Sequence, residues 1–258
     1  MANYYFLITA FPPLSCEMKL EMSFKDLKEI LLLNLSAKDF HEVERILRPI
    51  DLYNIKAFWL GLPLDERGNF REKDLEEELL VQGALPAYLI DYLARYDSTQ
   101  DRLRYFSSLY ASLYKEESEK LKGFSKCYYV LGREVRLCLA ALRAKRQGRD
   151  IVRELQFEDP TDPFVAQILA QKDALSYSPP QEYEELKNLF IENSLDPVKL
   201  DRAVLQFQFD RIEQMEEIQD FGIDRILNYV ARFLIVESLA HLNQKQGMAT
   251  VEQLSQYE

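Results

Sequence analysis

Hydrophobic residues between positions 124 and 142 recur at steps of three and four, which is the spacing of one face of a helix. They are Phe124, Tyr128, Leu131, Val135, Cys138 and Leu142. The pattern predicts a long helix reaching towards Asp150, whose apolar stripe docks on a neighbouring helix. Basic residues occupy its other side: Arg133, Arg136, Arg143, Lys145, Arg146 and Arg149. We interpret this stretch as a structural part that docks against something, not as a catalytic pocket.

Helix-start signals precede further runs of the same spacing. Ser23 with Asp26, and Ser36 with Asp39, fit an N-terminal cap with an acidic residue three positions later. The second of these runs is expected to stop before Pro49, with a separate short segment from 51 to 60. These signals predict helices joined by short turns in the first quarter of the chain.

The rest of the chain also has helical spacing. One helix is predicted over 101–121 and a compact one over 164–173. Gly123 is expected to separate the first from the basic-flanked helix, and the alternative is that the two run on as a kinked pair. Pro179-Pro180 and Pro197 suit first helical turns, and a last helix is predicted from about Ile223 into Gln246. No segment alternates strictly between apolar and polar residues. We therefore predict an all-α fold.

Composition excludes several classes of protein. The 258 residues are 47% hydrophobic and 29% charged, which is typical of a globular chain, and a net charge of −11 opposes binding to nucleic acid. No window is long and apolar enough to span a membrane, and we do not read the apolar opening as a signal peptide. We expect reduced thiols at Cys16, Cys127 and Cys138, and a cytoplasmic protein.

Chemistry-bearing motifs are not found in the sequence. There is no phosphate-binding loop, nucleophile elbow or paired-histidine metal motif, and His41 and His241 lack a second ligand at helical spacing. We therefore expect no catalytic residue, cofactor or metal. An all-helical hydrolase with scattered carboxylates stays open as an alternative, because such sites leave weak local traces.

A weak internal echo links two helices. The stretch from Leu139 to Lys145 resembles the one from Leu239 to Lys245, and a glycine follows each. Duplication and chance stay open as explanations. Glu134 and Glu237 lie at comparable places in these helices: they could form a buried carboxylate pair, or each could pair with an arginine such as Arg136 or Arg232.

The stretch from Glu134 to Asp150 resembles a helix of the C subunit of V-type (archaeal/bacterial A/V-type) ATP synthases, whose eukaryotic counterpart is the d subunit. That family closes the helix with Leu-Arg-Ala-Lys-x-x-Gly-x-Asp, which this chain matches from Leu142 onward, although Leu137 stands where the family often has asparagine. The final helix is similar as well, and the opening Tyr4-Tyr5-Phe6-Leu7 resembles a shorter bacterial branch. The second half of the chain carries most of the likeness.

The resemblance implies an all-helical, funnel-like array of repeated helical units without catalytic residues. Such a subunit caps the membrane rotor ring and receives the foot of the central stalk, so its partners would be other V-type ATPase subunits and it would lie at the inner membrane through its complex. We expect one domain, with possible subdomains near 1–122, 123–175 and 176–258. A helical adaptor or scaffold unrelated to any ATPase is the alternative.

Partner contacts are expected on the basic side of the long helix. The candidate residues are Arg136, Arg143, Lys145, Arg146 and Arg149. The competing interpretation is a solvated helix face, whose exposed charges contribute little. Among the many aromatic residues, tyrosines such as Tyr105 and Tyr114 are expected in the core with their hydroxyls at its rim.

Overall fold

The chain folds into helices joined by turns and loops within the part that the computed structural model describes, residues 3–83, 85–216 and 221–242. Those residues form thirteen α-helices and one 3₁₀ helix, with no strand, so the predicted all-α fold class is confirmed. The helices are α1 (Tyr5–Ala10), α2 (Phe24–Asn34), α3 (Ala37–Leu60), α4 (Glu72–Val81), α5 (Ala87–Arg95), α6 (Thr99–Arg104), α7 (Phe106–Lys120), α8 (Gly123–Gln147), α9 (Ile151–Glu154), α10 (Pro163–Leu169), η1 (Gln181–Tyr183), α11 (Glu184–Asn193), α12 (Pro197–Glu213) and α13 (Ile223–His241).

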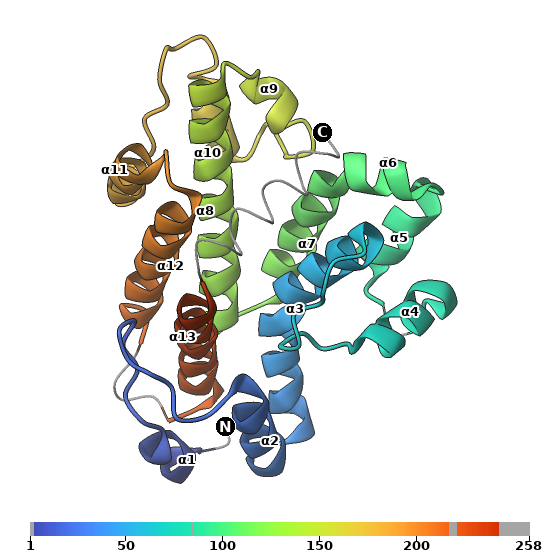
Figure 1. Ribbon diagram of the computed structural model, residues 1–258, viewed down its shortest axis with the longest axis vertical. Helices are drawn as coiled ribbons and strands as arrows, with labels where there is room; N and C mark the ends of the chain where they lie inside the picture. Colours follow the sequence, from blue (N-terminus) through green and yellow to red (C-terminus); the bar gives the residue numbers. More distant parts are fainter. Residues whose placement is uncertain (1–2, 84, 217–220, 243–258) are drawn as a thin grey trace.

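Helix α8 is the axis of the molecule. Figure 1 shows it running through the centre, with α12 and α13 on one side and α3 and α7 on the other. The predicted stripe is buried on it, except that Tyr128 is half-buried. Other α8 residues are buried too, among them Leu137, Leu139 and Ala141. The helix therefore packs on more than the one face that its apolar spacing predicts.

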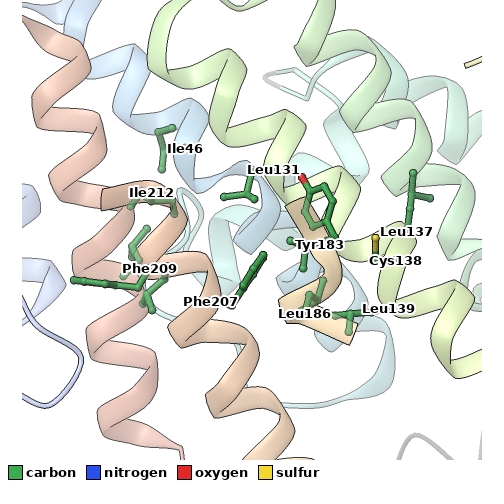
Figure 2. Close-up of a cluster of buried hydrophobic side chains, with 14 of the residues drawn as sticks. Ile46, Leu131, Leu137, Cys138, Leu139, Tyr183, Leu186, Phe207, Phe209 and Ile212 are labelled. Atoms are coloured by element: carbon green, nitrogen blue, oxygen red, sulfur yellow. The ribbon is translucent and has the colours of Figure 1, made fainter. Parts of the chain in front are cut away.

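Two hydrophobic cores lie along this axis. The first joins α2 and the N-terminal half of α3 to α8, α11, α12 and α13. Figure 2 shows part of it, where Ile46 of α3, Leu131 of α8, Leu186 of α11 and Phe207 of α12 gather. The second core joins the C-terminal half of α3 to α5 and α7 and takes Tyr129 from α8. Because α3 and α8 contribute to both cores, they connect the two.

Capping residues fix the helix starts that the sequence predicts. Ser23 and Asp26 form a reciprocal capping box at α2, and the Ser36 side chain accepts a hydrogen bond from the main-chain nitrogen of Asp39 at α3. At α12, the Asp196 side chain accepts from two main-chain nitrogens, with proline next in the chain. These local predictions are confirmed because caps depend on neighbouring residues alone.

The predicted break at Pro49 is wrong. Helix α3 runs unbroken to Leu60 with Pro49 inside it. Proline removes one donor from the helical ladder, which leaves the oxygen four residues earlier without its usual partner. In this fold the hydroxyl of Tyr129 supplies a donor to that oxygen, on Arg45, with a hydrogen bond of 2.7 Å. A contact from a helix distant in sequence thus keeps α3 continuous.

Other boundaries also differ from expectation. The helix predicted over 101–121 is two helices, α6 and α7, which meet at Tyr105. The predicted break at Gly123 is confirmed, since α8 begins there. Helix α13 ends at His241, with Leu242 as its extended C-cap, so it stops short of the predicted Gln246. Part of the internal echo, from 243 onward, lies outside the described residues. The subdomain boundaries stay a prediction.

No helix in the described part of the chain is both long enough and apolar enough to cross a bilayer.

Candidate functional site

Two of the basic residues on α8 are engaged inside the protein. Arg133 forms ion pairs with Glu158 at 3.3 Å and Asp162 at 3.1 Å, and Arg136 pairs with the same Glu158. The guanidinium of Arg136 also lies 5.5 Å from the ring centroid of Tyr114. The Glu158 side chain is only 6% exposed. These arginines therefore fix the segment between α9 and α10 against α8.

Three further candidates hold the end of α8 to its surroundings. The Lys145 amine donates to the main-chain oxygens of Lys172, at 2.5 Å, and of Ala174. Arg146 donates to the main-chain oxygen of Ser194 at 2.6 Å. Arg149 lies beyond the helix, which ends at Gln147, and pairs with Glu154 at 3.0 Å.

Arg143 differs from the other four candidates. No hydrogen bond or ion pair fixes its side chain among the described residues, and its charge acts on the carboxyl of Asp201. Burial raises the pKa of Asp201, and Arg143 opposes that shift. The five candidates thus run from the middle of α8 to just beyond its end, and four of them already have intramolecular partners. A partner-binding role for the cluster stays a prediction.

The two glutamates of the echoing helices do not meet, and neither pairs with Arg136 or Arg232. Glu134 accepts a hydrogen bond from the Tyr183 hydroxyl of η1, at 2.5 Å. Glu237, only 8% exposed, accepts from the main-chain nitrogen of Phe24 at the start of α2, at 2.8 Å. The carboxylate-pair alternative is therefore wrong, and the arginine alternative holds only for Glu237, whose partner is Arg67 at 3.7 Å.

A groove of about 220 Å³ opens where the two cores meet. Its lining comes from α3, α7, α8, α12 and α13, and from the segment between α3 and α4. Apolar side chains make most of its wall, including Pro49, Ile50, Leu131, Leu205, Ile212 and Leu234. Among the described residues that line it, Arg67 alone is charged. On a chain with 43 acidic and 32 basic residues, a groove without a carboxylate in its described lining stands apart from the rest of the surface.

Three polar side chains in the groove have no hydrogen-bond partner among the described residues. The hydroxyls of Tyr114 and Tyr128 and the amide of Gln208 make no hydrogen bond to any residue that the structure describes. Tyr114 is only 7% exposed. Burial raises the pKa of both phenols, and the influence of Tyr114 raises that of Tyr128 further, so both stay protonated and able to donate.

Gly132 explains how Tyr114 reaches the groove. A β-carbon at this position of α8 would lie 3.1 Å from the Tyr114 hydroxyl oxygen, tighter than ordinary contact. Glycine inside a helix costs about 0.5–1 kcal/mol relative to alanine. The close approach of α7 to α8 at this point accounts for a residue that helix propensity disfavours.

Arg67 closes one end of the groove and ties α13 to the segment before α4. Its guanidinium donates to the main-chain oxygen of Leu234 at 3.0 Å and to the Ser238 hydroxyl at 2.7 Å. It also forms an ion pair with Asp65, at 2.5 Å, and lies 3.7 Å from Glu237. These contacts hold the Arg67 side chain between α13 and the segment before α4.

The segment that carries Arg67 is anchored on α3 by a buried carboxylate. Asp51 is 7% exposed and accepts hydrogen bonds from the main-chain and side-chain nitrogens of Asn69, each at 2.6 Å. Burial raises its pKa to about 6, although Asn69, Lys28 and Arg48 act in the opposite direction. Gly68 packs against Asp51 and Asn54 so closely that a β-carbon would clash with both.

The arrangement favours binding over catalysis. Within the described ranges no group of three or more histidine, cysteine, aspartate or glutamate residues is placed to hold a metal ion. The free thiols of Cys16 and Cys138 have pKa values raised by burial, to about 11 and about 12, so neither is an activated nucleophile. What the groove offers is apolar surface with a few hydrogen-bond donors.

Sequence reasoning did not find this groove. It placed Tyr114 at the rim of the core, but not in one cleft with Arg67 and Gln208, which come from segments far apart in the chain. Gly132 was the available signal, because glycine within a strong helical pattern marks a close approach.

Comparison with known proteins yields relatives along nearly the whole chain. An uncharacterized protein of Chlamydia muridarum is 28% identical over 253 residues, which cover 96% of this chain and 95% of the relative. One of Chlamydia pneumoniae is 31% identical over 219 residues, covering 83% and 82%. One of Chlamydia trachomatis serovar D is 27% identical over 241 residues, covering 91% of each. No solved structure matches.

The family model that matches, over residues 1–256, is described as a protein of unknown function (DUF2764). This match overturns the assignment to the V-type ATP synthase family that the helix ending had suggested. The likeness around Leu142 to Asp150 is a short helix ending, and helices rich in leucine, alanine, arginine and lysine produce such likenesses without common descent.

Proposed function

This chain belongs to the DUF2764 family, and we propose that it is a non-catalytic helical protein that holds a partner protein in the groove between its two cores. The groove itself carries the proposal. It combines apolar wall residues with the hydroxyls of the buried Tyr114 and the half-buried Tyr128, which have no hydrogen-bond partner among the described residues. Protein-binding grooves have this composition, with apolar anchoring surface and a few polar groups that set orientation.

The rest of the molecule supports a passive, stiff body. Buried charges are used in internal pairs: Arg48 with Glu117, and Arg133 and Arg136 with Glu158. Such pairs hold helices in register and leave few titratable groups free for chemistry. A close-packed helical body moves as a rigid unit, because its interior resists compression.

A more specific form of this proposal has the protein link the central stalk of a V-type ATPase to its membrane rotor ring, lying at the inner membrane through its complex. A helical adaptor outside any ATPase is the other form. The partners retained by the full chain discriminate between the two.

The test is an affinity pull-down from detergent-solubilised membranes and from the soluble fraction, with wild-type protein and two variants. Leu205→Glu puts a charge in the groove wall, and Gln206→Glu puts the same charge on the exposed neighbouring position of α12. We expect Gln206→Glu to retain a specific partner and Leu205→Glu to lose it while keeping its helical circular dichroism. Equal retention by both variants would overturn the proposal.

ATPase subunits among the retained proteins would select the stalk-and-ring form. A soluble partner with no ATPase subunit would select the adaptor. Turnover of a substrate by the purified chain would refute the non-catalytic role.

A further inference from the structure

The wall of the groove is apolar and carries no free charge among its described residues. Three of its apolar side chains are only half-buried: Pro49, Ile50 and Leu205. Arg67, the one charged residue of the described lining, is already compensated by Asp65 and Glu237. An apolar surface that adjoins water favours a segment that covers it, and a wall without free charge favours a segment that is itself nearly uncharged.

The chain leaves α13 beside this groove. Ser238 of α13 lines the groove, and the helix ends three residues later at His241, about 5 Å further along its axis. The Ser238 hydroxyl and the main-chain oxygen of Leu234 both accept hydrogen bonds from Arg67. Leu242 is extended, so the chain departs from the helical direction at the end of the groove where Arg67 lies.

Sixteen residues follow, at positions 243–258, and their sequence matches the character of the groove. Every third residue in one stretch of this segment is apolar: Met248, Val251 and Leu254. Only three of the sixteen are charged, on a chain of which 29% is charged: Lys245, Glu252 and Glu258. The segment thus combines a short apolar series with little charge.

Reach and volume are compatible with a contact inside the same chain. The six residues from 243 to 248 span up to about 20 Å when extended, which is enough to bring Met248 back to the groove wall. A groove of about 220 Å³ admits a few side chains of this kind, while the backbone that carries them stays outside.

We infer that residues 243–258 bind in this groove of their own chain through Met248, Val251 and Leu254, and that a partner protein has to displace them. The second half of this inference rests on the proposed function and assigns a means of regulation to the groove.

Tethering favours such a contact. A short linker gives its segment an effective concentration of about 1 mM, so a segment with a Kd of about 0.1 mM as a free peptide fills its site about nine-tenths of the time. A competitor added from solution then binds about tenfold more weakly than it binds the empty groove.

Peptide binding to the full chain tests the contact. The probe is a fluorescent peptide of residues 243–258, and its anisotropy measures its affinity for wild type and for a chain with Val251→Glu and Leu254→Glu. Because that variant's own segment no longer fills the groove, we expect it to bind the peptide about tenfold more tightly than wild type does. The control carries Gln253→Glu and Gln256→Glu, the same two charges at polar positions, and should bind as wild type does.

A groove substitution then locates the peptide. Leu205→Glu, added to the Val251→Glu and Leu254→Glu chain, should abolish peptide binding, whereas Gln206→Glu on the exposed neighbouring position should not. Circular dichroism checks that each variant stays helical. Equal peptide affinity of wild type and the Val251→Glu, Leu254→Glu chain, or binding that survives Leu205→Glu, would overturn the inference. A dimeric wild type that becomes monomeric with Val251→Glu and Leu254→Glu would also overturn it, because the segment would then fill the groove of a second copy.

The two proposals fail differently. In the pull-down, the Val251→Glu, Leu254→Glu chain should retain more of the natural partner than wild type does. If it retains the same amount while Leu205→Glu loses the partner, the groove binds a protein but its regulation by residues 243–258 is wrong. If Leu205→Glu retains the partner, the proposed function falls, and the peptide affinities alone decide whether the segment binds in the groove.

Discussion

The hydroxyl of Tyr129 donates a hydrogen bond to the main-chain oxygen of Arg45, at 2.7 Å. That oxygen would accept from residue 49 in an uninterrupted helix, and Pro49 has no N–H to give. Tyr129 is 1% exposed, so no water replaces it without opening the second core. One phenol on α8 thus compensates for a proline on α3, at the point where the two cores join.

A double-mutant cycle tests this compensation. We expect Tyr129→Phe to destabilise the protein by about 1–3 kcal/mol, because the Arg45 oxygen is left buried without a donor. In a Pro49→Ala background residue 49 regains its N–H, so the same change should cost clearly less. Urea denaturation followed by circular dichroism measures both. Equal losses in the two backgrounds would show that the phenol acts by packing alone.

Glu237 predicts a second effect on stability. Its carboxylate accepts from Phe24 at the start of α2 and lies 3.7 Å from Arg67. Glu237→Ala keeps the Ser23 capping box but leaves the Phe24 N–H without its acceptor, and should lower the free energy of unfolding by about 2–3 kcal/mol. Glu237→Gln keeps an acceptor and should lose less. Hydrogen exchange of α2 localises the effect, and protection that is unchanged in Glu237→Ala would contradict the capping role.

Asp51 predicts a pH dependence with a defined sign. Its pKa in the folded protein is raised to about 6, above its ordinary 3.8, so the folded state binds the proton more tightly than the unfolded state. Its contribution to stability is fully present below pH 3.8 and is lost as pH rises through 6. As pH rises across this range, the free energy of unfolding of the wild type should therefore fall relative to that of Asp51→Asn by at most about 3 kcal/mol.

Urea denaturation of both proteins at several pH values between about 4 and 7 measures the difference. Glu66→Gln, at an exposed position of the same segment, is the control and should not reproduce the trend. A difference between wild type and Asp51→Asn that stays constant with pH would refute the raised pKa.

Lys145 gives a local prediction. Its amine holds the main-chain oxygens of Lys172 and Ala174 beyond α10. Lys145→Met should speed amide exchange across residues 170–177 while lowering global stability by about 1 kcal/mol or less, since the site is near the surface. Lys126→Met, an exposed substitution on the same helix, should change neither. Unaltered exchange in Lys145→Met would mean that the loop is held by other contacts.

Helical spacing and caps were sufficient to predict the fold class and most helix starts. Ser23 and Ser36 cap helices where expected and Pro197 stands in the first turn of α12, because these signals involve only residues within one turn. The buried stripe of α8 was equally predictable, since an apolar face at helical spacing has to be covered by other elements. The family could not be predicted in this way, because a shared helix ending pointed to the wrong family.

Tertiary structure decided everything that depends on which helices meet. In the sequence Pro49 indicates a helix end, and only the fold brings Tyr129 to the oxygen that the proline leaves without a donor. The α8 arginines likewise suggest a free surface, but two of them pair with Glu158 in the fold. The groove needs Arg67, Tyr114 and Gln208, whose distance along the chain hides their proximity. The physical reason is the range of the interactions: caps and periodicity act within a few residues, whereas burial, ion pairs and cavities arise only when distant segments pack together.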